Sequence, residues 1–523
     1  MSSVTTSNVR IAKNTLALYF RQIIILAVSL FTARIVLQAL GVTDYGINNV
    51  VGGVVLMFGF LSTTLTSITQ RFISVELGKG STPAVLQRIF STSIILHAAA
   101  GIIVIILAET VGLWFLNNKL VIPAERVMAA NWVYQFAVFG FLISLLSAPF
   151  TALIISHEDM HIYAYMGIFD AAARLAAVYL LVIINADKLM FWALCGLIIS
   201  AVLLFFYFIY CRKKYQEARF TFVYDNILIK KLSGFGGYVF ADNIFLILLH
   251  QGTNILINIF FGPVVNAAKG LANAVSTALL SFGSNFHQAI IPQITMACAA
   301  KNNEAMWSLV ERGTRMLYFL FLAFSVPILL ETEFVLKLWL KNVPEYTVIF
   351  TRLLIINALI ETFLATFWCV VRASGKLKAA YYSAYTLNVL TFVLCYLACR
   401  AGQPPYYVFI ILSLLRFLSC PYFFALAKKI YNFPIRAFIK KALFPIFCVS
   451  AASFLPFYAA DKLFPESMLR SGLVIMTSIL WTGIVIVLIG FRKNERTAAI
   501  AFVKRKFSAG KNSETVREPD FVD

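Results

Sequence analysis

The chain has 523 residues, of which 60% are hydrophobic and only 13% are charged. Soluble domains have about a quarter of their residues charged, so this composition excludes a soluble enzyme or a soluble nucleic-acid-binding module. The 44 Lys and Arg residues outnumber the 24 Asp and Glu residues, which gives a net charge of +20. We expect this surplus to contact anionic membrane lipids, and we expect no nucleic-acid partner.

Long apolar stretches separated by short connections run through almost the whole chain. Each is long enough to cross a bilayer as a helix, and their even number places both termini on one side. The sequence therefore predicts an all-α polytopic membrane protein with about fourteen transmembrane helices. The stretches lie at 14–38, 47–69, 90–115, 128–153, 162–184, 188–210, 234–260, 264–290, 311–334, 347–371, 379–399, 406–427, 438–460 and 469–491.

The basic residues alternate between the two sides of this predicted topology. The N-terminus, the even-to-odd connections and the C-terminal tail hold 30 of the 44 Lys and Arg residues, and the opposite loops hold nine. Positive residues concentrate on the cytoplasmic side of membrane proteins. We therefore expect both termini in the cytoplasm.

The sequence also repeats itself. Gly41 aligns with Gly262 at an offset of 221 residues, and the same offset places the first three spans over spans seven to nine. Six spans that occur twice in the same orientation indicate a parallel repeat, which is typical of transporters. We expect an N-terminal lobe at 1–220, a second six-helix lobe at 221–432, two extra helices at 433–491 and a basic cytoplasmic tail at 492–523.

Sequence motifs for chemistry are absent. The chain has no G-x-x-x-x-G-K-[ST] loop for a nucleotide, no H-E-x-x-H metal motif and no G-x-S-x-G nucleophile motif. We therefore expect neither an enzyme nor a bound cofactor or metal. Coupling to protons or sodium ions, for example through Asp242, is left open.

Two charges inside the predicted spans occupy equivalent repeat positions. Arg21 on the first span and Asp242 on the seventh are 221 residues apart, and a charge at the bilayer centre costs about 2.5–3.5 kcal/mol. One hypothesis is an ion pair between the lobes that an anionic substrate opens by competing for Arg21. The alternative is that each charge is satisfied within its own lobe. Asp170 and Arg174, four residues apart, are expected to pair along one helix face.

Polar stripes follow the helices that would flank the boundary between the lobes. Asn243, His250 and Asn254 share one face of the seventh span, and Asn266, Asn273 and Ser284 share one face of the eighth. Arg71 follows a run of hydroxyl residues at the end of the second span. Such groups hydrogen-bond sugars, although polar residues also hold helices together. Arg34 and Lys269 are expected near the outer face, where long side chains can reach water.

Several segments resemble one family of exporters. The segment Ala33-Arg34-Ile35-Val36-Leu37-Gln38-Ala39-Leu40-Gly41-Val42-Thr43-Asp44-Tyr45-Gly46, together with Gln70-Arg71-Phe72-Ile73 and Ala148-Pro149-Phe150, is similar to the polysaccharide-transport branch (O-antigen and capsule flippases) of the multidrug/oligosaccharidyl-lipid/polysaccharide (MOP) exporter superfamily. The resemblance implies two six-helix bundles with spans one, two, seven and eight at a central cavity. It also implies two extra spans that guide a lipid tail.

This resemblance implies a flippase of the bacterial inner membrane that moves undecaprenyl-diphosphate-linked oligosaccharide from the inner to the outer leaflet by alternating access. Arg21 and Arg34 would meet the diphosphate, and the polar stripes would meet the sugars. Polysaccharide polymerase machinery would be a partner. The alternatives are a cation-coupled multidrug exporter on the same fold and a flippase for the peptidoglycan precursor. A membrane-embedded glycosyltransferase would need larger extracytoplasmic loops than these.

Overall fold

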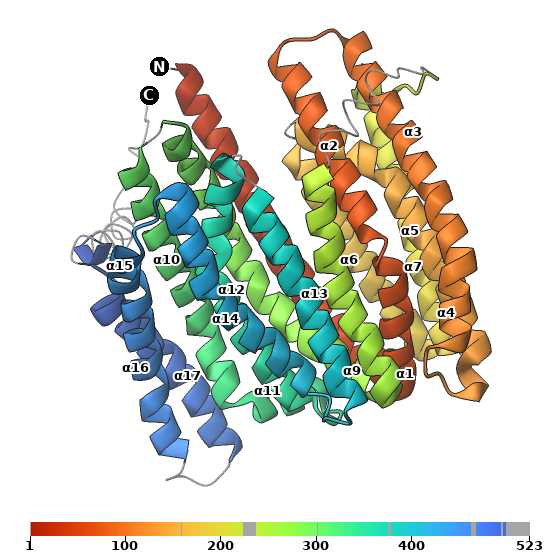
Figure 1. The fold of residues 1–523 in the computed structure, drawn as a ribbon. Helices are drawn as coiled ribbons and strands as arrows, with labels where there is room; N and C mark the ends of the chain where they lie inside the picture. Colours follow the sequence, from red (N-terminus) through yellow and green to blue (C-terminus); the bar gives the residue numbers. More distant parts are fainter. Residues whose placement is uncertain are drawn as a thin grey trace, which may run out of the picture. The chain divides into compact units, whose positions relative to one another are not determined.

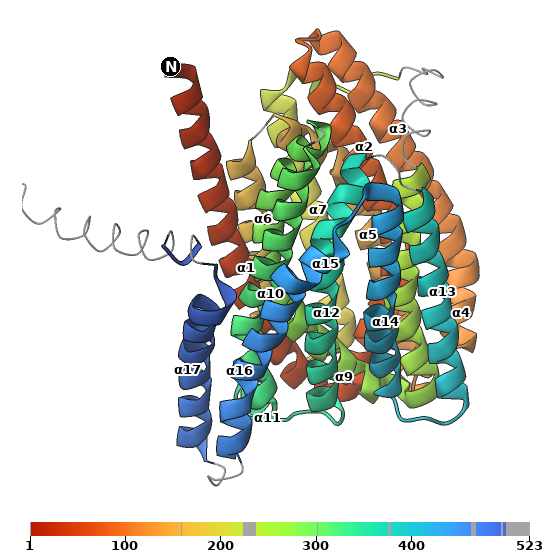
Figure 2. The same ribbon diagram turned by 60° about the vertical axis from the view of Figure 1, so that its left-hand side comes forward.

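The computed structural model describes residues 2–157, 159–222, 237–300, 302–374, 378–461, 467–492 and 495–497. The chain divides into two compact units, which are described separately. Unit 1 comprises Met1–Ser281, Leu336–Asn357 and Gly375–Ser419, and unit 2 comprises Phe282–Val335, Ala358–Ser374 and Cys420–Asp523. Throughout the described residues the secondary structure is helical and contains no strand (Figures 1 and 2).

The elements of unit 1 come mainly from the first half of the chain, and α9, α11, α12 and α14 extend from one unit into the other. They are α1 (Ser2–Leu56), α2 (Gly59–Gly78), α3 (Pro83–Leu107), η1 (Ala108–Gly112), α4 (Leu113–Asn118), η2 (Ala124–Arg126), α5 (Val127–Ser156), α6 (Met160–Ile183), α7 (Lys188–Lys214), η3 (Gln216–Ala218), α9 (Gly237–Ala299), α11 (Thr332–Leu340), α12 (Thr347–Ser374), α13 (Lys378–Arg400) and α14 (Tyr407–Tyr431).

Unit 2 contains the remaining elements. They are α10 (Asn303–Leu330), α15 (Ile435–Phe438), η4 (Ile439–Leu443), α16 (Phe444–Asp461), α17 (Met468–Val485) and η5 (Ile486–Gly490).

Two of these elements change direction at a glycine. Gly41 in α1 has φ 79° and ψ 170°, and Gly262 in α9 has φ 81° and ψ −179°. A side chain strongly disfavours this backbone conformation, so each glycine joins two straight legs. These are the two glycines that the sequence repeat aligns, and their shared geometry supports that alignment. The predicted boundaries of the lobes stay a prediction.

Contacts along unit 1 show that the legs of α1 are antiparallel. Before the turn, Val36 packs against Val178 and Leu181 near the end of α6. After the turn, the chain runs back as the second leg of α1 and then as α2, until the carbonyl of Gln70 accepts a hydrogen bond from Ser156 at the end of α5. Figure 1 shows α1 descending and returning in this way.

The predicted number of crossings follows from these turns. Twelve of the described helical segments are long and apolar enough to span a membrane. Two of them, Ile24–Leu56 and Ile244–Ser281, contain the turning glycines. Counting each leg separately gives the fourteen crossings expected from the sequence. The prediction of an all-helical, multi-pass integral membrane protein is therefore confirmed.

Apolar side chains hold the helices of each unit together. In unit 1, Ile47 and Val50 on the second leg of α1 are fully buried against Val133 on α5. In unit 2, aromatic rings fill the space beside α10, where Trp307 lies 4.8 Å from Phe433 between ring centroids. Branched aliphatic residues thus pack the second leg of α1 against α5, and tilted aromatic rings pack beside α10.

Unit 2 joins α17 to α10 near both ends of α17. The guanidinium of Arg470 donates to Glu331 at 3.1 Å, and the hydroxyl of Ser471 donates to the same carboxylate at 2.8 Å. The segment that follows α17 bonds to α10 through Glu495 and Arg315. Polar contacts therefore attach α17 and the segment after it to α10 at two separate places.

Candidate functional site

The second leg of α1 and α9 approach each other closely next to the two glycine turns. A Cβ atom on Gly46 would lie 1.8 Å from the carbonyl oxygen of Pro263. A Cβ on Gly270 would lie 3.0 Å from the amide nitrogen of Asn49 and 3.3 Å from the ring of Tyr45. Backbone therefore meets backbone here, and no side chain fits at Gly46. We call this region the α1–α9 contact.

Asparagine side chains bridge the α1–α9 contact. The amide of Asn49 donates to the carbonyl of Asn266 at 3.0 Å and to the side-chain oxygen of Asn254 at 3.5 Å. In return, the amide of Asn254 donates to the carbonyl of Asn49 at 3.2 Å. The side chain of Asn266 is 0% exposed, and its amide has no hydrogen-bond partner among the described residues. The bridge is neutral, and the side-chain amide of Asn266 can still form further hydrogen bonds.

A further asparagine ties α9 to the loop between α4 and η2. The side-chain oxygen of Asn258 accepts from the backbone N–H of Val121 at 2.8 Å, and its amide donates to the carbonyl of Val121 at 3.3 Å. Asn258 is fully buried. One side chain therefore satisfies both polar groups of a loop residue, as a strand partner would, and this fixes the loop against α9.

An ion-pair cluster attaches the turn of α1 to η2 and to the start of α7. Arg126 donates to Asp44 through Nε at 2.8 Å and to Asp187 through a terminal nitrogen at 2.6 Å. Asp187 also caps α7 by accepting from the backbone N–H of Met190 at 3.0 Å. Burial alone would raise the pKa of Asp187, but the hydrogen bonds from Arg126 and Met190 outweigh it and hold the pKa below the usual value. This cluster explains why an aspartate follows the turn at Gly41.

A buried lysine joins the two legs of α9. The side chain of Lys269 is 4% exposed, and its amine donates to the hydroxyl of Thr253 at 3.0 Å and to the carbonyl of His250 at 3.3 Å. No carboxylate among the described residues lies within ion-pair distance of it. The interpretation of Lys269 as a side chain that reaches water is therefore wrong, because its amine points between the two legs.

The predicted site residues fall into several environments. Asn254 and Asn266 meet in the α1–α9 contact, whereas the side chains of His250, Asn273 and Arg71 are exposed. Their role in binding a substrate stays a prediction.

Other predicted residues lie apart from that contact or outside the described side chains. Arg34 is half-buried on α1, with no hydrogen bond or ion pair among the described residues. The expected pair of Arg174 with Asp170 is confirmed at 3.0 Å. The side chains outside the described residues are those of Arg21, Asp242, Asn243 and Ser284, so the proposed pairing of Arg21 with Asp242 is not tested.

Sequence reasoning missed Asn49, although the repeat contained a signal for it. Adding the offset of 221 residues to Asn49 gives Gly270, the residue that Asn49 contacts. A residue that touches its own repeat equivalent lies close to the axis that relates the two repeats. A search for small or amide residues at equivalent positions next to Gly41 and Gly262 would therefore have found the contact.

No protein-family model and no curated protein sequence matches the chain. Among solved structures, lipid II flippase MurJ in an inward closed conformation matches with a TM-score of 0.67 at 14% identity, over 91% of this chain and 98% of that one. An inward-facing multidrug resistance MATE family transporter of the MOP superfamily matches with a TM-score of 0.63 at 13% identity, over 80% and 99%. The MATE multidrug transporter DinF-BH matches with a TM-score of 0.60 at 14% identity, over 81% and 96%. The chain thus has the fold of MOP-type transporters.

Proposed function

We propose that this protein is a flippase that moves undecaprenyl-diphosphate-linked oligosaccharide from the inner to the outer leaflet of the bacterial inner membrane. The observation that carries the proposal is the extent of the structural match. The flippase fold covers 91% of this chain, whereas the multidrug transporters cover 80–82%. The difference is comparable in length to the segment from α15 to η5, which adds a helix pair to the two predicted lobes.

The added helix pair offers a surface for a lipid tail. The stripe along α17 is strongly exposed and entirely apolar, with residues spaced at three and four positions as on one helix face. A polyprenyl chain needs such a continuous apolar surface when its headgroup leaves the leaflet. The stripe consists of Leu469, Leu473, Met476, Leu480 and Ile484.

The α1–α9 contact has the properties of a gate. On the topology that the positive-inside rule predicts, the two glycine turns face the outside of the cell. Each polar bond across the contact is between neutral groups and contributes about 1 kcal/mol net. Water or sugar hydroxyls can replace such bonds when the helices separate, so the contact can open for release of an oligosaccharide.

A positive group on the first leg of α1 suits a diphosphate. Arg34 is half-buried within a predicted span and has no anionic partner among the described residues. A cation in this position favours an anionic ligand over a cationic one. Moving each negative charge out of a negative-inside cell releases about 2.3 kcal/mol per 100 mV, which can drive export without ATP. A coupling ion at Asp242 stays a prediction.

The runner-up is a multidrug exporter, because the MATE transporters share the fold over nearly their full length. A chain that exports small lipophilic cations would not need a cation on α1 that has no anionic partner among the described residues. Lipid II is the third candidate substrate, since a lipid II flippase matches this chain over 91% of its length.

The test is lipid translocation in proteoliposomes under an imposed membrane potential. A fluorescent undecaprenyl-diphosphate oligosaccharide is reconstituted, and a membrane-impermeant glycosidase reports its arrival in the outer leaflet. We expect exposure that depends on the protein and falls about tenfold in Arg34→Gln, the size of effect that a lost charge-assisted contact gives. The control is Arg174→Gln, because Asp170 already pairs with that cation. Efflux of small cations without lipid exposure would overturn the proposal in favour of the exporter, and exposure of lipid II alone would change the substrate.

A further inference from the structure

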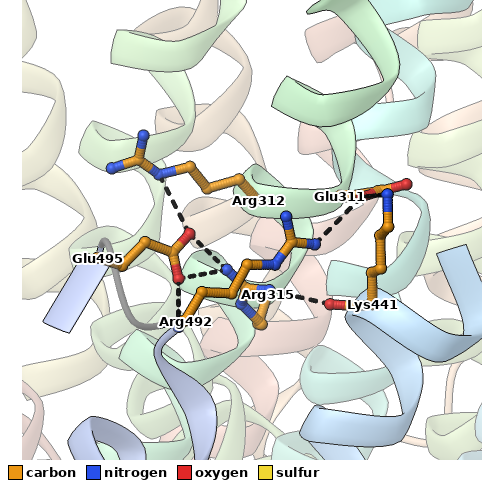
Figure 3. Close-up of polar contacts among 6 residues, drawn as sticks. All are labelled: Glu311, Arg312, Arg315, Lys441, Arg492 and Glu495. Atoms are coloured by element: carbon orange, nitrogen blue, oxygen red, sulfur yellow. Dashed lines mark hydrogen bonds and ion pairs between the residues drawn. The ribbon is translucent and has the colours of Figure 1, made fainter. Parts of the chain in front are cut away.

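A cluster of charged residues lies in unit 2, where the third and fourth turns of α10 meet η4 and the segment after η5. Figure 3 shows the side chains converging from these three elements. The cationic members, which we call the cationic cluster, are Arg312, Arg315, Lys441 and Arg492, and the carboxylates among them are Glu311 and Glu495.

Arg315 is the buried centre of the cationic cluster. Its side chain is 1% exposed, and one terminal nitrogen lies 2.5 Å from both oxygens of Glu495. The other terminal nitrogen donates to the carbonyl of Lys441 at 2.9 Å, within the π-helical turn η4, a widened turn of a kind common at functional sites. The Nε of Arg315 is buried and has no partner among the described residues.

Glu495 receives a set of donors that is typical of phosphate sites. Besides Arg315, its carboxylate accepts from the backbone N–H of Arg492 at 2.9 Å and lies 3.6 Å from Nε of Arg312. Two guanidinium groups and a backbone N–H around one anion match the oxygens of a phosphate as well as those of a carboxylate. Glu495 thus occupies a position that a phosphate could take.

Charge balance indicates that the cluster can hold more negative charge than it does. Its four cations face two carboxylates, and Glu311 satisfies Arg492 at 3.2 Å while lying 4.0 Å from Lys441. Two positive charges are therefore not matched by a carboxylate among the residues that the structure describes. A simple anchor between helices would need one cation for each carboxylate, so the surplus points to a further anion. The side chains of Arg312, Lys441 and Arg492 are exposed and accessible to one.

We propose that the cationic cluster is a binding site for a phosphate-bearing lipid headgroup and that Glu495 takes the place of the phosphate oxygens in this structure. The predicted topology places this end of α10 at the cytoplasmic leaflet, where anionic headgroups accumulate. A headgroup phosphate displaces Glu495 from Arg312 and Arg315 and neutralises the surplus charge. The phosphate can come from membrane phospholipid or from a polyprenyl-diphosphate lipid, and the site is therefore independent of what the protein transports.

Native mass spectrometry of the full-length protein in detergent tests the site. The protein is mixed with phosphatidylglycerol or with diacylglycerol of the same acyl chains, which lacks the phosphate. In Glu495→Gln the competing charge is gone, and we expect about threefold to tenfold more retained phosphatidylglycerol than in wild type. The double variant Arg312→Gln/Lys441→Gln changes only exposed side chains, so it should fold, and we expect about threefold to tenfold less. Diacylglycerol retention should not change.

The control is Arg212→Gln, which removes an exposed basic residue from the last turn of α7 in unit 1. The proposal is overturned if both variants of the cluster retain phosphatidylglycerol as wild type and Arg212→Gln do. Adding undecaprenyl diphosphate identifies the source of the phosphate. If it displaces phosphatidylglycerol, the site binds the polyprenyl lipid. If phosphatidylglycerol stays bound, the site binds membrane phospholipid. The measurement needs no transport, so it can succeed where the flippase assay fails.

Discussion

The α1–α9 contact in unit 1 and the cationic cluster in unit 2 hold helices together by opposite means. The first uses glycine, a backbone carbonyl and neutral amides, and its closest approach is at Gly46 and Pro263. The second uses four cations and two carboxylates around the buried Arg315. Both join segments that are distant in sequence, so the difference lies in how easily each can open.

Neutral and charged contacts respond differently to separation. A neutral hydrogen bond contributes about 1 kcal/mol net, because water replaces the lost partner. Removing one partner of a buried ion pair costs about 3–5 kcal/mol, because a charge stays unpaired. The comparison teaches that the α1–α9 contact suits a gate, whereas the cationic cluster keeps its segments attached unless another anion takes over. Four predictions test the α1–α9 contact and the Arg126 ion-pair cluster next to it, from the largest expected effect to the smallest.

The largest effect is expected from Gly46→Ala. The added methyl group would overlap the carbonyl oxygen of Pro263 at 1.8 Å, so α1 and α9 cannot close, and transport should fall more than about tenfold. Spin labels on Leu56, an exposed residue of the second leg of α1, and on Val264 of α9, in a background without native cysteines, should report a longer distance. Gly52→Ala is the control, because no atom lies within 4 Å of its added Cβ. Equal transport and equal spin-label distances in the two variants would mean that the close approach at Gly46 does not close the α1–α9 contact.

Arg126→Gln tests whether the ion pairs of Arg126 stabilise the turn of α1 next to the α1–α9 contact. The substitution leaves the carboxylates of Asp44 and Asp187 close together without a cation, and the free energy of unfolding should fall by about 1–3 kcal/mol, measured by denaturation in detergent. Arg174→Gln removes a more exposed pair with Asp170 and should cost less than about 1 kcal/mol. Similar losses of unfolding free energy in both variants would mean that the Arg126 cluster does not stabilise the turn of α1.

Acid should weaken the ion-pair cluster of Arg126 with Asp44 and Asp187. The pKa of Asp187 lies below its ordinary value of 3.8, so its ionised form stabilises the folded state above that pH. This stabilisation is lost as the pH falls below 3.8 and through the lowered pKa. The melting temperature of Asp187→Asn should therefore be lower than that of wild type at neutral pH, and the two should converge in acid. A constant difference across this range would contradict the assignment.

The smallest effect is expected from Asn49→Ala. The variant loses the hydrogen bond to the carbonyl of Asn266, which should shift the open population by about fivefold, equivalent to about 1 kcal/mol. The same pair of spin labels measures it. Asn117→Ala removes an amide that pairs with Asn131 on an exposed surface, and it should leave the distance unchanged. A larger effect than that of Gly46→Ala would mean that the amides, not the backbone approach, close the contact.

Local sequence signals predicted the architecture because they depend on nearby residues. Apolar length predicted the crossings, and the aligned Gly41 and Gly262 share one backbone conformation. The spacing of Asp170 and Arg174 predicted their ion pair. The same signals misplaced the side chain of Lys269, because nearness to a helix end does not show whether Thr253 and His250 are there to receive its amine.

The sequence by itself determined the class of this protein: an all-helical membrane protein built from a repeated set of spans with two helices added. Only the tertiary structure decided which polar residues meet. Asn49 and Asn254 are 205 residues apart, and Arg315 and Glu495 are 180 residues apart. Hydropathy and helical periodicity are properties of one segment, whereas these contacts depend on how whole helices pack, since a polar group inside a membrane protein needs a partner from another segment.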